Sequence, residues 1–163
     1  MRSLIIDGYN AIHKIEQLES KRDAGLEIAR LYFIKMLQDF MSQKNIFDKI
    51  FIVFDGKEKE PGIRRQSYGR IEVLFTTYDK DADSAIVDLL RDASPGDKIS
   101  VASDDNFVRN HAKGFGRDTL SINELKEIVL KKKNFKSKIK DKDLKSDKIK
   151  DINEELKKYW GLK

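Results

Sequence analysis

Residues 3–11, Ser3-Leu4-Ile5-Ile6-Asp7-Gly8-Tyr9-Asn10-Ala11, decide how this chain can fold. They begin with a short apolar run that stops at an Asp-Gly pair. Three later apolar runs also end in aspartate or lead into it: Phe51-Ile52-Val53-Phe54-Asp55, Val73-Leu74-Phe75 ahead of Asp79, Asp81 and Asp83, and Ile99-Ser100-Val101-Ala102-Ser103-Asp104-Asp105. Because parallel strands end at one edge of their sheet, these acids are expected to gather there. Carboxylates that gather repel one another unless a cation lies among them, so the pattern is a functional clue.

Apolar strands alternate with helical periodicity along the chain, which is typical of an α/β fold. Strands are expected at residues 3–6, 49–54, 71–76 and 98–102, with a brief fifth strand at 119–120. Helices are expected at residues 23–42, 83–93 and 105–113, and the capping box Ser121-Ile122-Asn123-Glu124 predicts one more, to about residue 132. The sequence therefore predicts a central, mostly parallel sheet of four to five strands flanked by helices.

Residues 56–70 interrupt this alternation and are rich in lysine and arginine. We predict a long exposed basic loop here, with Arg64, Arg65 and Arg70 available to a polyanion. Tyr68 is the aromatic residue of this loop, and it can either stack on a base or pack against the protein.

Length indicates one well-buried domain, because 163 residues suffice for a single core and are too few for two. The charged fraction of 37% is high, but enough patterned apolar sequence remains for a core. No apolar run approaches the roughly 18 residues of a membrane span. Asp7 interrupts the first apolar run, which argues against a signal peptide. The absence of cysteine excludes disulfides and thiolate metal sites. We expect a cytoplasmic protein with no membrane partner.

Positive charge is concentrated in the last part of the chain. Residues 1–130 carry 20 Lys and Arg against 22 acids, whereas residues 131–163 carry 13 Lys against 6 acids. We therefore divide the chain into a domain at 1–130 and a lysine-rich extension at 131–163. The extension either binds a polyanion or only solvates itself. Its helix at about 147–160 has an apolar stripe that packs on the domain or on a partner.

Each strand-end aspartate has an ordinary alternative role as a helix cap or turn residue. Caps do not explain why four strand ends carry acids together, and hard carboxylate oxygens are what Mg²⁺ prefers. Other catalytic arrangements are poorly supported. His13 and His111 are far apart in sequence, a phosphate-binding glycine loop is absent, and Tyr9 stands where an Asp-x-Asp phosphatase needs its second acid. A receiver domain would also need a lysine after a late strand, and no candidate stands out there.

The block Asp7-Gly8-Tyr9-Asn10-Ala11-Ile12 resembles the opening signature of the YacP-like NYN domains, a branch of the PIN-like ribonucleases. Later blocks resemble that family in order and spacing: Val53-Phe54-Asp55, Ala82-Asp83, Val101-Ala102-Ser103-Asp104 and Leu120-Ser121-Ile122-Asn123-Glu124-Leu125. The resemblance covers about residues 3–130. It implies a three-layer, PIN-like Rossmannoid fold and metal-dependent endonucleolytic cleavage of RNA, with one or two Mg²⁺ or Mn²⁺ ions.

Carried over position by position, the resemblance implies that Asp7, Asp83 and Asp104 are metal ligands. Asp55 corresponds to the acid after the second strand, and Asn10 to the asparagine that supports the site. The remaining candidates have no firm match in the family: Asp81 and Asp105 as helper acids, caps or metal ligands, and Arg109 and Lys113 as phosphate contacts or solvated surface residues.

The family branch is linked to ribosome-associated decay of messenger RNA, so mRNA and the ribosome are the expected partners. The leading hypothesis is a metal-dependent endoribonuclease. The alternative is a non-catalytic RNA- or ribosome-binding module with the same fold, whose binding would survive Asp→Asn changes.

Overall fold

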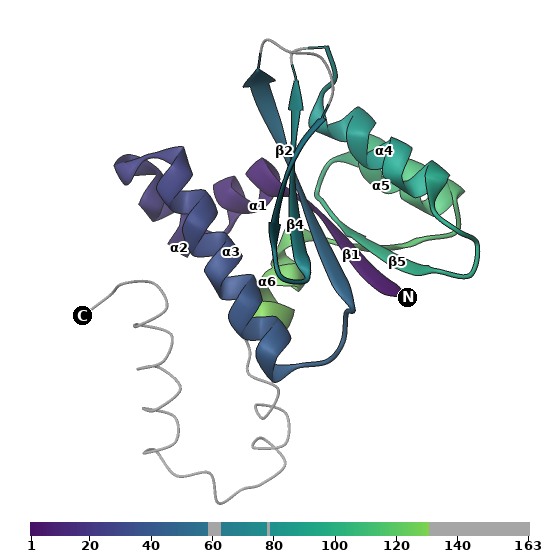
Figure 1. Ribbon diagram of the computed structural model, residues 1–163, viewed down its shortest axis with the longest axis horizontal. Coiled ribbons are helices and arrows are strands. Elements are labelled where there is room, and N and C mark those ends of the chain that lie inside the picture. Colours follow the sequence, from purple (N-terminus) through teal and green to yellow (C-terminus); the bar gives the residue numbers. More distant parts are fainter. Residues whose placement is uncertain (59–62, 78, 131–163) are drawn as a thin grey trace, which may run out of the picture.

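The computed structural model describes residues 1–58, 63–77 and 79–130 (Figure 1). The strands are β1 (Arg2–Asp7), β2 (Lys49–Glu58), β3 (Ile63–Tyr68), β4 (Ile71–Thr77), β5 (Lys98–Ala102) and β6 (Asp118–Leu120). The helices are α1 (Gly8–Lys14), α2 (Glu16–Glu19), the 3₁₀ turn η1 (Ser20–Ala24), α3 (Leu26–Gln43), α4 (Ala82–Asp92), α5 (Asn106–Gly114) and α6 (Ile122–Leu130).

The strands form one sheet in the order β3-β4-β2-β1-β5-β6. All neighbouring strands are parallel except β3 and β4, which are antiparallel. β1 lies in the interior of the sheet, with β2 on one side and β5 on the other. Since the chain order reverses direction around β1, its carboxyl end is a topological switch point, where open α/β sheets place their ligands.

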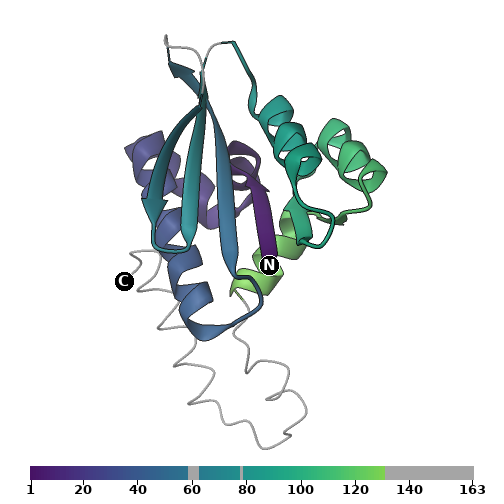
Figure 2. The ribbon, with the colours of Figure 1, turned by 45° about the vertical axis from the view of Figure 1, so that its right-hand side comes forward.

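Helices cover both faces of the sheet, so the expected three-layer α/β fold is confirmed (Figures 1 and 2). The larger apolar cluster joins α1, α2, α3 and α6 to one face, and the smaller cluster joins α4 and α5 to the other. Alternation within β1 accounts for this, because Leu4 and Ile6 face the first cluster while Ile5 faces the second.

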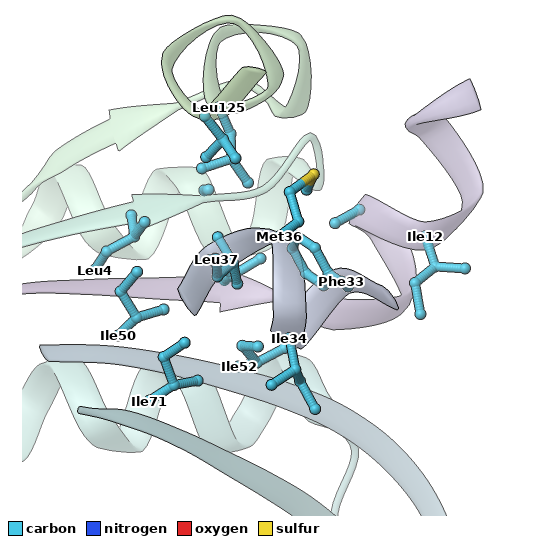
Figure 3. Close-up of a cluster of buried hydrophobic side chains, with 14 of the residues drawn as sticks. Leu4, Ile12, Phe33, Ile34, Met36, Leu37, Ile50, Ile52, Ile71 and Leu125 are labelled. Carbon is cyan, nitrogen blue, oxygen red and sulfur yellow. The ribbon is translucent and has the colours of Figure 1, made fainter. Parts of the chain in front are cut away.

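The core on the α3 face contains fully buried aliphatic side chains from strands and helices (Figure 3). Phe33 and Leu37 of α3 are 0% exposed there, as are Ile50 and Ile52 of β2. Burying one such side chain contributes about 1.5–3 kcal/mol, so this layer holds the strand ends rigidly in place.

The prediction of a long loop at residues 56–70 is wrong. β2 continues to Glu58, and residues 63–68 form β3, an antiparallel edge strand that adds a sixth strand to the sheet. Gly69 has a φ of +65°, a left-handed conformation that favours glycine in the two-residue turn into β4. The strand has almost no apolar pattern because it is a solvated sheet edge, where charged residues discourage pairing with other chains.

The other expectations are met within a few residues. Helix α3 begins at Leu26 rather than residue 23, because η1 and Gly25, with a φ of +121°, precede it. The Ser121–Glu124 capping box is confirmed by reciprocal hydrogen bonds of 2.8 and 3.0 Å between these two residues. The expected helix at 147–160 and the extension at 131–163 lie outside the described residues, so the division at residue 130 stays a prediction.

None of the helices in the described ranges combines the length and apolar character needed to cross a membrane.

Candidate functional site

Asp7 is the last residue of β1 and lies at the switch point of the sheet. It is only 8% exposed, and the Ser103 hydroxyl donates a hydrogen bond of 3.1 Å to its Oδ2. Burial, followed by the negative charge of Asp83, raises the pKa of Asp7 to about 6. A carboxylate in this setting gains from a nearby cation, because it is desolvated and repelled at once.

Gly8 lets helix α1 start directly against β2. A Cβ atom at this position would lie 2.4 Å from Cε1 of Phe54 and 2.9 Å from the carbonyl oxygen of Val53. Both neighbours are fully buried, so neither can move aside cheaply. The Asp-Gly pair is thus a close-packing requirement that holds Asp7 and Tyr9 at the sheet edge.

Asp83 stands in the first turn of α4 and faces the same edge. Burial raises its pKa, and the charges of Asp105, Asp81 and Asp55 raise it further. Within the described part of the chain, its carboxylate has no hydrogen bond or ion pair. Asp83 is partly buried, whereas Asp7 is buried, and the charges that shift the pKa values of both residues belong to other acids.

Asp104 and Asp105 are adjacent in sequence but have different surroundings. Asp105 caps α5 by accepting a hydrogen bond of 3.1 Å from the Val108 N–H, and its charge raises the pKa values of Asp7 and Asp83. Asp105 therefore faces the acid cluster.

The Asp104 carboxylate accepts a hydrogen bond of 2.9 Å from the Ile122 N–H at the start of α6 and pairs with Lys14 at 3.0 Å. Burial acts to raise the pKa of Asp104, but the Ile122 N–H and Lys14 outweigh it, so this pKa lies below its usual range. Unlike Asp105, this carboxylate is already neutralised within the protein.

Side chains around the loop after β5 hold it in place. The Asn10 side-chain carbonyl accepts a hydrogen bond of 2.9 Å from the Asp104 N–H, and the Ser103 hydroxyl accepts one of 3.0 Å from the Asp105 N–H. Arg109 donates to the Ser103 carbonyl at 3.1 Å. Asn10 and Arg109 thus fix the loop geometry, and Ser103 links that loop to Asp7.

Asp55 and Asp81 lie at the rim of the cluster. Asp55 is exposed near the end of β2, where the Thr76 hydroxyl donates to it at 3.4 Å. Asp81 is the N-cap of α4 and accepts a hydrogen bond of 2.8 Å from the Ser84 N–H, which lowers its pKa. The helix-cap alternative is thereby confirmed for Asp81 and also for Asp105.

The predicted RNA-contact residues lie in separate environments. Arg65 pairs with Glu72 across the β3–β4 ladder at 3.0 Å, and Arg70 donates to the Met41 carbonyl at 3.2 Å. Tyr68 packs partly buried against the larger core cluster, and Lys113 is exposed in the last turn of α5. Of the three predicted arginines, Arg64 is the one that shares a cavity with a residue of the acid cluster, Asp55.

Divalent metal binding is compatible with the donor chemistry of this edge. Asp7, Asp83 and Asp105 supply hard carboxylate oxygens, and burial followed by repulsion from neighbouring acids raises the pKa values of the first two. Within residues 1–58, 63–77 and 79–130, however, no three His, Asp or Glu side chains are grouped tightly enough to hold an ion by themselves. Mg²⁺ commonly takes one or two carboxylates and completes its shell with waters and substrate phosphate.

Sequence reasoning missed Ser103 and Lys14 as site residues. Ser103 was part of the Ser-Asp-Asp motif, so its proximity to the acids was the available signal. Lys14 carried no such signal, because its partner Asp104 is 90 positions away along the chain and meets it only through the β1–β5 pairing.

Comparison with known proteins assigns the family. The family model of the YacP-like NYN domain matches residues 4–161. The protein YacP of Bacillus subtilis, described as uncharacterized, is 30% identical over 86 residues, which cover 53% of this chain and 49% of that protein. The chain thus matches about half the length of this curated relative.

Two crystal structures of Rae1 (YacP) from Bacillus subtilis have the same fold. One matches with a TM-score of 0.65 and 27% identity over 96% of this chain and 86% of that chain. The other, a mutant of the same protein, matches with a TM-score of 0.64 and 26% identity over 85% of this chain and 78% of that chain. This chain therefore belongs to the YacP-like NYN domain family and has its PIN-like fold.

Proposed function

We propose that this protein is a metal-dependent endoribonuclease that cuts RNA at the acidic edge. The observation that carries the proposal is the gathering of Asp7, Asp83 and Asp105 at the switch point of the sheet, with the pKa of Asp7 raised to about 6. Acids that are buried near one another have raised pKa values and lower the stability of the fold, and residues with strongly shifted pKa values cluster at functional sites. Membership of a family with a PIN-like nuclease fold supports the same reaction class.

Asp7, Asp83 and Asp105 would hold Mg²⁺ or Mn²⁺, as one or two ions, with Asp55 at the rim. The metal would supply an activated water and neutralise charge on the scissile phosphate. The product ends expected from in-line attack are a 5′-phosphate and a 3′-hydroxyl.

The protein's own contribution is orientation. The Ser103 hydroxyl donates to Oδ2 of Asp7, and the Asn10 backbone also stabilises the charged form of this carboxylate, so both orient it. The α5 cap fixes one oxygen of Asp105, and Asn10 holds the backbone of its loop. Asp104, expected from the family resemblance to be a ligand, is assigned instead to positioning, because Lys14 and the start of α6 already neutralise it.

The proposed substrate is single-stranded RNA, and the family resemblance extends this to messenger RNA, with the ribosome as a partner and the cytoplasm as the location. The lysine-rich residues 131–163 would add a distributed positive charge that attracts the phosphate backbone.

The test is cleavage of a labelled single-stranded RNA with Mg²⁺ or Mn²⁺ by wild type, Asp7→Asn and Asp83→Asn. Each variant is expected to lose about 100-fold or more in rate, the order of magnitude of one electrostatic contact in a catalytic site. Asp118→Asn is the matched control, because this exposed acid lies at the amino end of β6, away from the acidic edge. Full activity in both variants would reject the metal site, and RNA binding without any cleavage by wild type would favour the non-catalytic alternative.

A further inference from the structure

A cavity of about 510 Å³ lies beside the acidic edge, on the α3 face of the sheet. Its volume is in the range of small-ligand sites. Its lining includes Tyr9, Arg22, Arg30, Asp55, Arg64 and Phe75. Asp55 belongs both to this cavity and to the rim of the acid cluster, so a molecule seated in the cavity would reach the acidic edge directly.

We call this cavity the arginine pocket, because positive charge dominates its lining. Three arginines, Arg22, Arg30 and Arg64, face one carboxylate, Asp55. Arg22 is paired with Glu19 at 3.0 Å, yet its Nε is buried and has no hydrogen-bond partner among the described residues. Guanidinium groups are the side chains best matched to phosphate, which they bind through two parallel N–H donors.

The Phe75 ring packs against two of the three arginines, Arg30 and Arg64. The guanidinium carbon of Arg30 lies 5.3 Å from the Phe75 ring centre and that of Arg64 lies 4.7 Å from it. Arg30 also donates a hydrogen bond of 3.0 Å to the Tyr9 hydroxyl. A guanidinium stacked on a ring keeps its N–H donors in plane, and its outer face can stack on a base.

A second cavity of about 280 Å³ lies next to the first and shares Arg30, Arg64 and Phe75 with it. Gln66 and Tyr68 of β3 line this second cavity. The two cavities thus lie on either side of the stacked arginines, with Asp55 lining the first and the edge strand β3 lining the second.

We propose that the arginine pocket binds one nucleotide of a single-stranded RNA, directly next to the phosphate that lies at the acidic edge. Arg30 and Arg64 contact the backbone phosphate of that nucleotide, and the strand continues toward β3. The inference rests on the proposed nuclease function for the direction of the strand, but binding can be measured without any cleavage.

The test is the affinity of the full chain for a fluorescein-labelled eight-nucleotide RNA in the presence of a chelator, so that cleavage cannot contribute. Arg30→Gln and Arg64→Gln are each expected to weaken binding about tenfold, the loss expected for a charge-assisted hydrogen bond. Lys98→Gln is the matched control, because it removes one exposed positive charge at the amino end of β5, far from the pocket, and should change affinity less than about twofold.

Salt dependence separates a phosphate contact from a general change in charge. Loss of one such contact should reduce the slope of log affinity against log salt by about 0.7, whereas Lys98→Gln should leave the slope unchanged. Arg30→Lys keeps the positive charge but loses the paired N–H donors of the guanidinium, so its RNA affinity should lie between those of Arg30→Gln and wild type. Arg64 is exposed on an edge strand, so Arg64→Gln tests the pocket even if Arg30→Gln disturbs folding.

Unchanged RNA affinity in both Arg30→Gln and Arg64→Gln would overturn the inference. Equal affinity for uridine monophosphate and for the RNA would overturn strand binding in favour of a free-nucleotide site. If wild type cleaves RNA and the arginine variants raise KM while kcat stays within about threefold, the pocket is supported as a binding site. If the variants lose RNA affinity but wild type never cleaves, the pocket stands and the nuclease proposal fails.

Discussion

The acidic edge and the arginine pocket are neighbours with opposite character. The edge gathers Asp7, Asp83 and Asp105, whose charges oppose one another, while the pocket gathers arginines that aromatic rings and a tyrosine hydroxyl hold in place. Asp55 is common to both regions. Under the proposed function, the acidic edge carries the chemistry and the arginine pocket beside it binds the substrate.

The largest expected effect is on the rate of RNA cleavage, and it should differ between the adjacent acids Asp105 and Asp104. Asp105→Asn should reduce RNA cleavage about 100-fold, because it removes a carboxylate that faces the cluster. Asp104→Asn should reduce cleavage less, by about tenfold, because its carboxylate binds Lys14 and the α6 amide and acts only by positioning. The measurement is the single-turnover rate with Mn²⁺, and the reverse order would restore Asp104 as the ligand.

Burial of Asp7, together with charge repulsion at the edge, predicts a pH-dependent stability. The folded pKa of Asp7, about 6, exceeds its unfolded value of 3.8, so the folded state binds the proton more tightly. Stability should therefore fall as pH rises from about 4 to 6, by roughly 3 kcal/mol if Asp7 alone contributes.

Asp7→Asn should remove this dependence and raise the metal-free unfolding free energy at pH 7.5, with little gain at pH 4. Urea unfolding in a chelator at the two pH values measures it. Added Mn²⁺ should raise the melting temperature of wild type more than that of the variant. Equal unfolding free energies of wild type and Asp7→Asn at pH 7.5 would contradict the raised pKa of Asp7 in the folded state.

Gly8 is the packing element that joins the two regions, since α1 carries Tyr9 into the pocket directly after Asp7. Gly8→Ala should lower stability by about 1–3 kcal/mol, because its Cβ would meet the buried Phe54 ring at 2.4 Å. Gly96→Ala is the matched control, since nothing lies within 4 Å of a Cβ there, and it should change stability by less than about 0.5 kcal/mol. Equal melting temperatures of the two variants would remove Gly8 from this role.

The smallest expected change in stability is at Asp104. Its pKa is lowered in the fold, so its contribution is complete above the unfolded pKa and is lost as pH falls through the folded value. Asp104→Asn should cost about 1 kcal/mol at pH 7, the size of a helix cap with a partly exposed ion pair, and less near pH 2. A cost independent of pH would show that the charge is not what stabilises α6.

Much of the fold was predictable because buried strands carry continuous apolar runs. The parallel strands β1, β2, β4 and β5 and the Ser121–Glu124 capping box were all expected, and the family resemblance was confirmed. The edge strand β3 escaped prediction because an exposed strand needs no apolar pattern. The site was predicted as a set of strand-end acids, but the roles of Asp104 and Asp105 could not be separated from their positions in the sequence.

The sequence by itself determined that strands end in acids and that a glycine follows the first of them, because strand burial and close packing are local demands on residue type. Tertiary structure alone decided which of those acids face one another, since Asp105 turns toward Asp83 while Asp104 turns toward Lys14. It also brought Arg64 of β3 to the same cavity as Arg22 and Arg30, which lie more than 30 residues earlier in the chain. Charges set their energies through distance in space, and that distance exists only once the sheet and its helices have packed.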